Sequence, residues 1–190
     1  GREHSIYVDK LKTKEIVKEI CGDEIEVPKV VKIIENIDDL SKNDLSTSYI
    51  IKGSHGSKLN INIKEEKEIE NISEIKKRLH RYNRQYKPYK NENQYNYLTP
   101  KFFIEEKIDD FYTGLSGEAT VFMIRCIYGK AVSIGVLHNK YMNNYYLDWT
   151  PIKINIDIDL EENKDEINKM ISLSEKLSQF FEFVRVDFYL

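Results

Sequence analysis

Short runs of β-branched and aromatic residues, several with a strict two-residue alternation, constrain the fold of this chain more than any other feature of its sequence. The last run, Phe183–Leu190, places Val184 and Val186 toward one face and Arg185 and Asp187 toward the other. Because successive side chains of a strand point to opposite faces, this pattern predicts a strand. A strand this regular should lead into another element, so we expect the chain to be a fragment cut inside a fold.

Other runs predict further strands, two pairs of which should form hairpins. The first pair is 49–52 and 59–63, on either side of the small-residue loop 53–57. The second pair is 119–128 and 130–137, on either side of Gly129. Two single runs are 30–34 and one that begins at Phe102. A lone glycine between two β-rich runs is typical of a tight turn. We therefore expect the second pair to be adjacent and antiparallel.

Three segments have apolar residues at helical spacing: 9–21, a segment from Ser73 that ends before Pro88, and 161–179. Asp9 is a favourable residue to cap the first of these helices, and Gly22 is a favourable residue to end it. The stretches 87–99 and 141–149, rich in Tyr and Asn, are expected to be loops. Together these elements predict an α+β fold.

Composition bounds the class of protein. A length of 190 residues is that of one domain, or of one domain with pieces of another. Hydrophobic residues make up 41% of the chain, which is enough to form a core. The net charge of -3 gives no general attraction to nucleic acid or to an anionic membrane. The two cysteines, Cys21 and Cys126, lack zinc or disulfide spacing and are expected in the core, which fits a reducing, cytoplasmic setting. No apolar run approaches the roughly 18 residues of a membrane helix.

Lys52 is the first candidate for chemistry, because it ends a predicted strand just before a glycine-containing loop. An ammonium group and several backbone N–H groups at such a place can bind phosphate oxygens. The alternative is an ordinary hairpin with a solvated lysine. The segment does not match the P-loop pattern.

Two further candidates lie on predicted strands. Arg185 and Asp187 share one face of the last strand, and a metal ion, a phosphate or each other would satisfy their charges. A structural ion pair is the equally probable alternative. Glu105 to Ile108 ends another strand, and by itself this segment favours a solvated strand terminus over a site.

The helix that begins at Ser73 carries basic residues interleaved with tyrosines, which is suitable chemistry for nucleic acid. These residues are Lys76, Lys77, Arg78, Arg81, Arg84 and Lys87 with Tyr82, Tyr86 and Tyr89. The acidic overall balance favours a solvated face instead. The four histidines lack the spacing of a zinc site, so no zinc enzyme is predicted.

Several short motifs occur along the chain in an order that narrows the choice of protein family. They are Asp9-Lys10 with Lys14; Tyr49-Ile50-Ile51-Lys52; His55-Gly56-Ser57 with Asn60; Pro100 before Phe103-Ile104-Glu105-Glu106; Gly129-Lys130; Asn144-Tyr145-Tyr146-Leu147-Asp148-Trp149; and Phe183-Val184-Arg185-Val186-Asp187-Phe188-Tyr189. In this order and spacing the chain resembles the TupA-like branch of the ATP-grasp superfamily, which is associated with teichuronopeptide and capsular or cell-surface polysaccharide biosynthesis.

The resemblance implies an ATP-grasp-like α+β fold of two β-rich subdomains with flanking helices, truncated at both ends. Residues 1–29 would be a helical entry segment, 30–106 the smaller nucleotide-covering subdomain, and 107–190 part of the larger one. A nucleotide would be held between the two subdomains. The implied cofactors are ATP and Mg²⁺.

The resemblance also implies roles for individual residues. Lys52 would contact the phosphates and Arg185 would lie near the transferred phosphate, and these two are the implied catalytic residues. Asp187 would be the first acidic magnesium ligand. The cofactor-binding residues would be Lys52, the loop His55, Gly56 and Ser57, and the hinge Glu105, Glu106, Lys107 and Ile108, which would meet adenine largely through backbone groups.

This sequence departs from the family pattern at three places. Lys58 and Leu59 replace two glycines that the family has after the His-Gly-Ser loop, which should stiffen it. Met123 replaces a basic residue, for which Arg125 on the same side is a substitute. The chain also ends before the strand with the second acidic ligand, so the metal site is expected to be incomplete.

The leading hypothesis for function is an ATP- and Mg²⁺-dependent ligase. Such a ligase would activate a carboxylate as an acyl phosphate, which an amine or similar nucleophile then attacks. The implied partners are ATP and a carboxylate-bearing glycan or peptide precursor, without nucleic acid or a membrane span. The alternative is a non-catalytic nucleotide or glycan binding module on a degenerate ATP-grasp scaffold.

Overall fold

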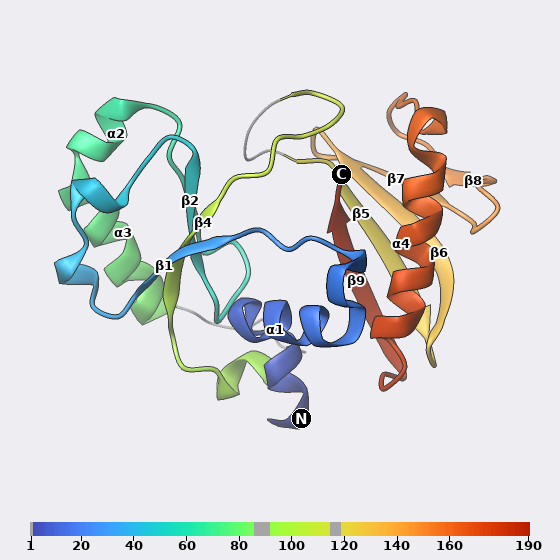
Figure 1. The fold of residues 1–190 in the computed structure, drawn as a ribbon, viewed down its shortest axis with the longest axis horizontal. Coiled ribbons are helices and arrows are strands. Elements are labelled where there is room, and N and C mark those ends of the chain that lie inside the picture. The colour runs from blue at the N-terminus through green and yellow to red at the C-terminus, as the bar shows by residue number, and fades with distance from the viewer. Residues whose placement is uncertain (1, 86–91, 115–118) are drawn as a thin grey trace. The chain divides into compact units, whose positions relative to one another are not determined.

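The computed structural model of the chain describes residues 2–85, 92–114 and 119–190. The chain divides into two compact units (Figure 1). Unit 1 comprises Gly1–Glu19 and Ile25–Lys107, and unit 2 comprises Ile20–Glu24 and Ile108–Leu190. Each unit contains one antiparallel sheet and helices, so the predicted α+β class is confirmed.

The sheet of unit 1 has four strands in the order β1-β4-β2-β3. Their bounds are β1 Val30–Ile34, β2 Tyr49–Gly53, β3 Asn60–Asn62 and β4 Phe102–Glu106. The predicted hairpin of β2 and β3 is confirmed, and β4 pairs antiparallel with both β1 and β2. Strand β4 therefore lies inside the sheet, although almost 50 residues of sequence separate it from β2.

One face of this sheet forms the core of unit 1. The helices α2 Glu66–Glu70 and α3 Ile72–Gln85 contribute Ile69, Ile75 and Leu79 to the same buried cluster as Ile51 and Ile104. The short 3-10 helices of unit 1 are η1 Arg2–Tyr7, η3 Ile37–Asp39, η4 Lys42–Asp44 and η5 Asn93–Tyr97. The other face of the sheet carries both buried apolar side chains, such as Ile50 and Phe103, and polar ones.

The first long helix confirms its predicted ends. Helix α1 spans Lys10–Cys21, and the Asp9 carboxylate accepts the backbone N–H of Leu11 at 2.9 Å, as an N-terminal cap does. Gly22 follows with a φ of +56°, the left-handed conformation that commonly ends a helix. The 3-10 helix η2 Gly22–Glu24 comes next.

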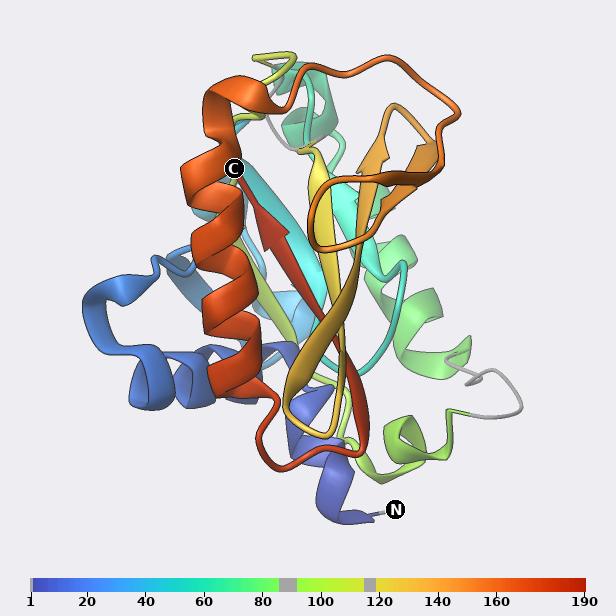
Figure 2. The same ribbon diagram turned by 90° about the vertical axis from the view of Figure 1, so that its right-hand side faces the viewer.

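The sheet of unit 2 has five strands in the order β8-β7-β6-β5-β9. They are β5 Val121–Ile127, β6 Lys130–His138, β7 Tyr141–Tyr145, β8 Pro151–Lys153 and β9 Phe183–Tyr189. The predicted hairpin around Gly129 is confirmed, with a φ of +74° at that glycine. After the 3-10 helix η6 Glu161–Asn163, helix α4 Lys164–Leu177 packs on one face of the sheet (Figure 2).

The last strand shows the alternation that its sequence predicts. Val184 and Val186 are partly buried and Phe188 is buried, whereas Arg185 and Asp187 are exposed. Cys21 and Cys126 are both buried and free, as predicted for core residues. In the part of the chain that the structure describes, we find no helix with the length and apolarity needed to cross a membrane.

The prediction that residues 141–149 form a loop is wrong, because β7 occupies the first half of this stretch. The sequence obscured this strand, since asparagine is disfavoured in strands and two of its five residues are asparagines. The side chain of Asn143 is buried and accepts the N–H of Asn155 at 2.8 Å and of Ile156 at 3.1 Å. The amide therefore bonds the segment that follows β8, where an apolar residue would not.

The prediction of a loop over residues 87–99 is corrected in part, since η5 occupies Asn93–Tyr97. The predicted end of the basic helix before Pro88, together with Tyr86, Lys87 and Tyr89, lies outside the described residues.

Candidate functional site

The alternation of β2 and β4 places Lys52 and Glu105 on the face of the unit 1 sheet opposite the core cluster, together with the buried Ile50 and Phe103. Ile51 and Ile104 pair across the two strands and belong to the core cluster. Lys52 and Glu105 come next to them in sequence, so their side chains lie on the opposite face of the sheet. Two strands that are distant in sequence thus bring a lysine and a glutamate together.

Glu105 is a buried carboxylate with two lysine partners. Its Oε1 is paired with the ammonium group of Lys52, and its Oε2 lies 3.0 Å from Nζ of Lys14. The side chain of Glu105 is only 2% exposed, so the expectation of a solvated strand terminus is wrong for this residue. The alternative of a solvated Lys52 is also wrong, because its side chain is only 17% exposed. Glu106, by contrast, is exposed.

A third lysine joins this group from helix α1. Lys10 lies one helical turn before Lys14, and its Nζ donates to the carbonyl oxygens of Gly53, at 2.8 Å, and of Gly56. Lys10 therefore links helix α1 to the last residue of β2, Gly53, and to Gly56 in the loop that follows it. We call Lys10, Lys14 and Lys52 the lysine cluster.

The lysine cluster carries more positive charge than its carboxylate neutralises. Burial, and after it the positive charge of Lys52, lower the pKa of Lys10 from 10.5 to about 8. Burial also lowers the pKa of Lys14, although Glu105 acts in the opposite direction. Three ammonium groups gather around one buried carboxylate, and the Asp9 carboxylate acts on Lys10 as a weaker second negative charge. An anion bound here would relieve both the burial cost and the mutual repulsion.

The loop after β2 is held by backbone bonds at both ends. The N–H of Gly53 donates to the carbonyl of Leu59 at 2.7 Å, and the N–H of Ser54 donates to that of Lys101 at 2.9 Å. A Cβ on Gly53 would lie 2.9 Å from Cβ of Leu59, so the hairpin can close this tightly only around a glycine. The loop is thus a fixed element beside the lysine cluster.

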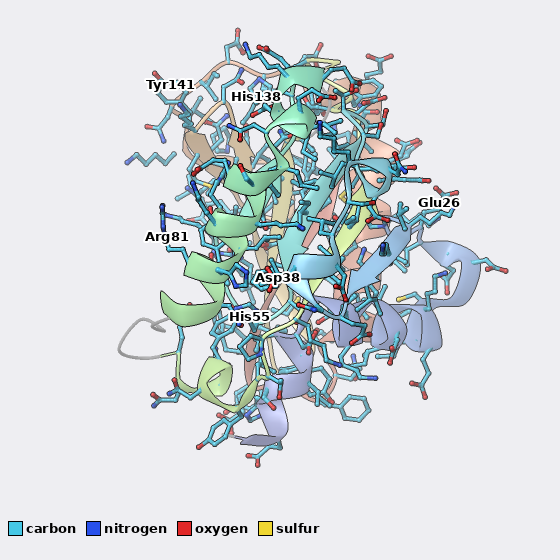
Figure 3. The ribbon with its side chains drawn as sticks, turned by 90° about the vertical axis from the view of Figure 1, so that its left-hand side faces the viewer. Glu26, Asp38, His55, Arg81, His138 and Tyr141 are labelled. Carbon is cyan, nitrogen blue, oxygen red and sulfur yellow. The ribbon has the colours of Figure 1, made fainter. Side chains whose placement is uncertain are left out.

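His55 anchors this loop from inside unit 1. Its side chain, labelled in Figure 3, is 1% exposed. The ring packs edge-on against Phe102, with ring centroids 5.3 Å apart. Burial lowers the pKa of His55, so its imidazole is neutral at pH 7. The contribution of His55 to an anion site is therefore to position the loop, and not to add charge.

Lys58 has a left-handed backbone conformation, which glycine adopts more readily than lysine. Its φ is +60°, in the left-handed region that costs a non-glycine residue roughly 1–2 kcal/mol. A lysine has fewer accessible backbone states than a glycine, and the stiffening of the loop stays a prediction. Ser57 and Lys58 are exposed, while Gly56 is buried.

The predicted hinge uses part of its backbone within unit 1. The N–H of Glu106 donates to the carbonyl of Lys29 at 3.0 Å, and the N–H of Lys107 donates to that of Ser48 at 2.9 Å. The ammonium group of Lys107 bonds the carbonyl of Thr47 at 2.5 Å. The peptide from Lys107 to Ile108 is also where unit 1 ends and unit 2 resumes.

Arg185 and Asp187 satisfy each other on β9. Nε of Arg185 lies 2.7 Å from Oδ1 of Asp187, and the second contact of this two-pronged pair measures 2.8 Å. Arg125 lies directly opposite Arg185 on β5, and Met123 lies opposite Asp187. Two arginines face each other across the strands, which is unfavourable unless an anion bridges them. Asp187 is the nearest such anion in sequence.

Lys52 belongs to unit 1, whereas Arg185 and Asp187 belong to unit 2. Their joint action on one triphosphate stays a prediction. Within residues 2–85, 92–114 and 119–190, no three acidic, histidine or cysteine side chains gather as a metal site would require. The role of Asp187 as a magnesium ligand likewise stays a prediction.

The basic face of α3 is partly engaged within unit 1. Nζ of Lys76 donates to the carbonyl of Asp38 at 2.6 Å, and Nε2 of His80 lies 3.0 Å from the Asp38 carboxylate. Arg81 points away from the helix into solvent (Figure 3). This distribution fits a solvated helix face that also contacts η3.

Two antiparallel sheets, each packed by helices, and a lysine cluster around a buried glutamate define an α+β protein with a candidate anion site in unit 1. The chain belongs to the TupA-like ATP-grasp family, because the family model described as TupA-like ATPgrasp matches residues 1–190. The predicted family is thereby confirmed. No match was found among the curated proteins.

Two solved structures similar to the chain are both of the ATP-grasp ligase PsnB. One is complexed with a phosphomimetic variant of a minimal precursor, Mg and ADP, and the other with a minimal precursor. Their sequence identities to the chain are 11% and 10%, with TM-scores of 0.48 and 0.47. Each match covers 98% of this chain but only 47% and 49% of those chains, so the chain spans about half their length.

Proposed function

We propose that the lysine cluster binds the polyphosphate of ATP, and that the whole protein is an ATP- and Mg²⁺-dependent ligase. The observation that carries the proposal is the gathering of three ammonium groups around one buried carboxylate, Glu105. A nucleotide triphosphate carries several negative charges on closely spaced oxygens, which three neighbouring ammonium groups can contact at once. Membership of the TupA-like ATP-grasp family supports ATP as the anion.

In this proposal each group near the cluster has a separate task. Lys52 contacts the phosphates, and Glu105 holds Lys52 and Lys14 in place between turnovers. The loop His55 to Ser57 covers the phosphates, with His55 as its buried anchor. The hinge from Glu105 to Ile108 meets adenine through those backbone groups that unit 1 does not already use.

Unit 2 would supply the residues for phosphoryl transfer. We propose that Arg185 stabilises the transferred phosphate and that Asp187 is one ligand of Mg²⁺. Magnesium in nucleotide sites is commonly held by one or two carboxylates together with the phosphates, so a single aspartate is chemically suitable. When bound, Mg²⁺ neutralises charge on the phosphate oxygens. Asp187 must then exchange its two-pronged pair with Arg185 for the metal.

The proposed reaction has two steps. A substrate carboxylate oxygen forms a bond to the γ-phosphorus while the bond to ADP breaks, which gives an acyl phosphate. An amine then forms a bond to the acyl carbon, phosphate leaves, and the amine proton passes to phosphate or water. We propose a carboxylate-bearing glycan or peptide precursor as the substrate, in cell-surface polysaccharide or peptidic polymer biosynthesis.

One observation favours a second candidate, a nucleotide or glycan binding module without turnover. The Arg185–Asp187 pair already satisfies both charges, so Asp187 gains less from a metal ion than an unpaired carboxylate would. This candidate shares the lysine cluster with the first and differs only in the use of Mg²⁺.

A calorimetric titration with ATP, with and without Mg²⁺, tests the proposal on the chain and on its Asp187→Asn variant. We expect saturable binding of ATP that Mg²⁺ strengthens several-fold, because the metal ion adds a link between carboxylate and phosphates. The variant should keep the affinity without Mg²⁺ and lose the strengthening. ATP binding that Mg²⁺ strengthens equally in both proteins would exclude Asp187 as a ligand, and no saturable ATP binding would contradict the proposal as a whole.

A further inference from the structure

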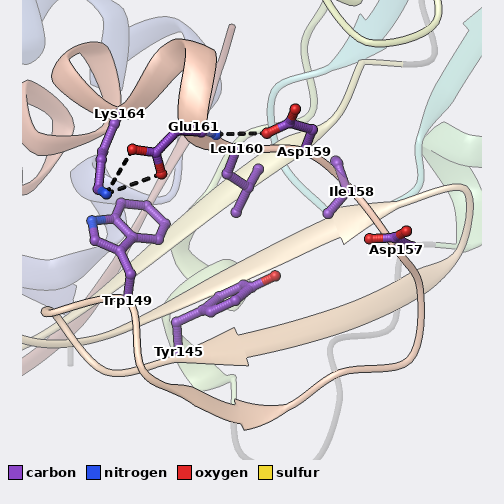
Figure 4. Close-up of a pocket in the computed structure, with 8 residues that line it drawn as sticks. All are labelled: Tyr145, Trp149, Asp157, Ile158, Asp159, Leu160, Glu161 and Lys164. Atoms are coloured by element: carbon purple, nitrogen blue, oxygen red, sulfur yellow. Dashed lines mark hydrogen bonds and ion pairs between the residues drawn. The ribbon is translucent and has the colours of Figure 1, made fainter.

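Unit 2 contains a pocket on the α4 face of its sheet, with a volume of about 460 Å³ (Figure 4). Tyr145 of β7 forms part of it, and so do the loop before η6 and the first residue of α4, Lys164. In the register of the sheet, Tyr145 pairs with Ile134, which pairs with Ile124 and through it with Val186. Because side chains alternate along β9, Arg185 and Asp187 lie on the other face of this sheet. The pocket is separate from the residues proposed for phosphoryl transfer.

Two aromatic rings give the pocket an apolar wall. The rings of Tyr145 and Trp149 have centroids 5.8 Å apart at an angle of 56°. Trp149 has a φ of +69°, a conformation that costs a residue of this size roughly 1–2 kcal/mol. Ile158 and Leu160 extend the apolar lining. A volume of this size, with aromatic and aliphatic walls, is within the range of small-ligand sites.

The charges around these walls are mainly negative. Asp157, Asp159 and Glu161 line the pocket together with one cation, Lys164. Both carboxylate oxygens of Glu161 lie 3.0 Å from Nζ of Lys164, so that pair is neutral. Asp159 accepts the backbone N–H of Glu161 at 2.9 Å, which fixes its carboxylate without neutralising it. Asp157 and Asp159 therefore remain as two negative charges in the lining of the pocket.

We propose that this pocket binds an aliphatic ammonium group carried on an apolar stem. The two uncompensated aspartates attract a cation, and the faces of Tyr145 and Trp149 add cation–π attraction for an ammonium group. The apolar stem packs against the aliphatic part of the lining. Phosphates and carboxylates are repelled by the same charges, so the pocket does not take the ligand of the lysine cluster.

An ammonium group on an apolar stem occurs both in a peptide lysine side chain and in a free diamine. The test therefore uses two probes, Nα-acetyl-lysine methylamide and 1,5-diaminopentane, and the neutral Nε-acetylated form of the first. Trp149 is the single tryptophan of the chain, so its fluorescence reports on the pocket directly. Calorimetry on the same samples gives the affinity without this reporter.

We expect at least one amine to bind saturably and at least 10-fold more tightly than the acetylated form, a difference of about 1.4 kcal/mol. The relative affinities of the two amines identify the source of the ammonium group. Asp157→Asn with Asp159→Asn should weaken binding about 10-fold, and salt should weaken it as well. Asp165→Asn, an exposed change of the same kind outside the pocket, should leave it unchanged.

Equal binding of the acetylated form would overturn the proposal, because the charge would then play no part. Absence of binding by both amines in calorimetry would overturn it too. The proposal does not depend on the ATP site. Lys52→Ala should leave amine binding intact, and the two aspartate changes should leave ATP binding intact, so each site succeeds or fails by its own measurement.

Discussion

Replacing Lys52 by alanine should lower the affinity of the chain for ATP by about 10- to 100-fold, or about 1.4–2.7 kcal/mol. Lys52 is the member of the lysine cluster that ends β2, and its ammonium group lies in a largely buried setting where charge is poorly screened. Loss of a charge-assisted bond to a phosphate in such a setting costs about 1.5–3 kcal/mol. Isothermal titration calorimetry at pH 7 measures the change.

Lys58→Ala is the matched control for this variant. Lys58 belongs to the loop that follows β2 but is exposed, so its removal should change the affinity by no more than about 2-fold. Circular dichroism should show that Lys52→Ala remains folded, because Glu105 keeps Lys14 as a partner. Equal losses in the two variants, or none in either, would mean that the phosphates do not bind at the lysine cluster.

Replacing Glu105 by glutamine should lower the free energy of unfolding by about 3 kcal/mol, because removal of one partner from a buried ion pair costs roughly 3–5 kcal/mol. The substitution keeps the shape of the side chain and removes the single negative charge between Lys14 and Lys52. Urea unfolding measures the loss. Tripolyphosphate should stabilise this variant more than the parent, since it replaces the missing negative charge.

Glu106→Gln is the control one residue away. Its carboxylate lies 3.4 Å from Nζ of Lys29 in an exposed pair, so the change should cost less than about 0.5 kcal/mol. A loss at Glu105 no larger than at Glu106 would show that the buried pair is not needed.

The pKa of Lys10 makes the free energy of unfolding of the parent chain depend on pH. Between pH 8 and 10.5 the unfolded chain holds the Lys10 proton and the folded chain does not, so the free energy of unfolding rises with pH in that window.

The sequence predicted the strands of unit 1 because alternation and small-residue turns are local signals. It did not predict the setting of Glu105, since that depends on the pairing of β4 with β2 and on the approach of α1. A glutamate becomes buried beside two lysines only through the tertiary structure. The strand pattern places Glu105 and Glu106 on opposite faces but does not show which of the two is buried, and only Glu105 is.

Lys10 was within reach of sequence reasoning as part of a site. Lys10 and Lys14 are four residues apart on a predicted helix, so they share one face of it. That spacing identifies a pair of cations on one surface, but not the loop carbonyls that Lys10 contacts. The pocket of unit 2 could not be predicted from the sequence. It depends on β7, and the asparagines of that stretch predict a loop.

The protonation of Lys10 gives the most direct measurement of whether the lysine cluster binds polyphosphate. Lysine carbons labelled with ¹³C can be followed by NMR through a pH titration, and the Lys10 signal is identified by its loss in Lys10→Ala. In the free chain we expect a midpoint near the pKa of about 8. Bound tripolyphosphate should raise that midpoint by more than about one pH unit, because an anion favours the charged form. A midpoint that stays unchanged when tripolyphosphate is bound would contradict the proposed site.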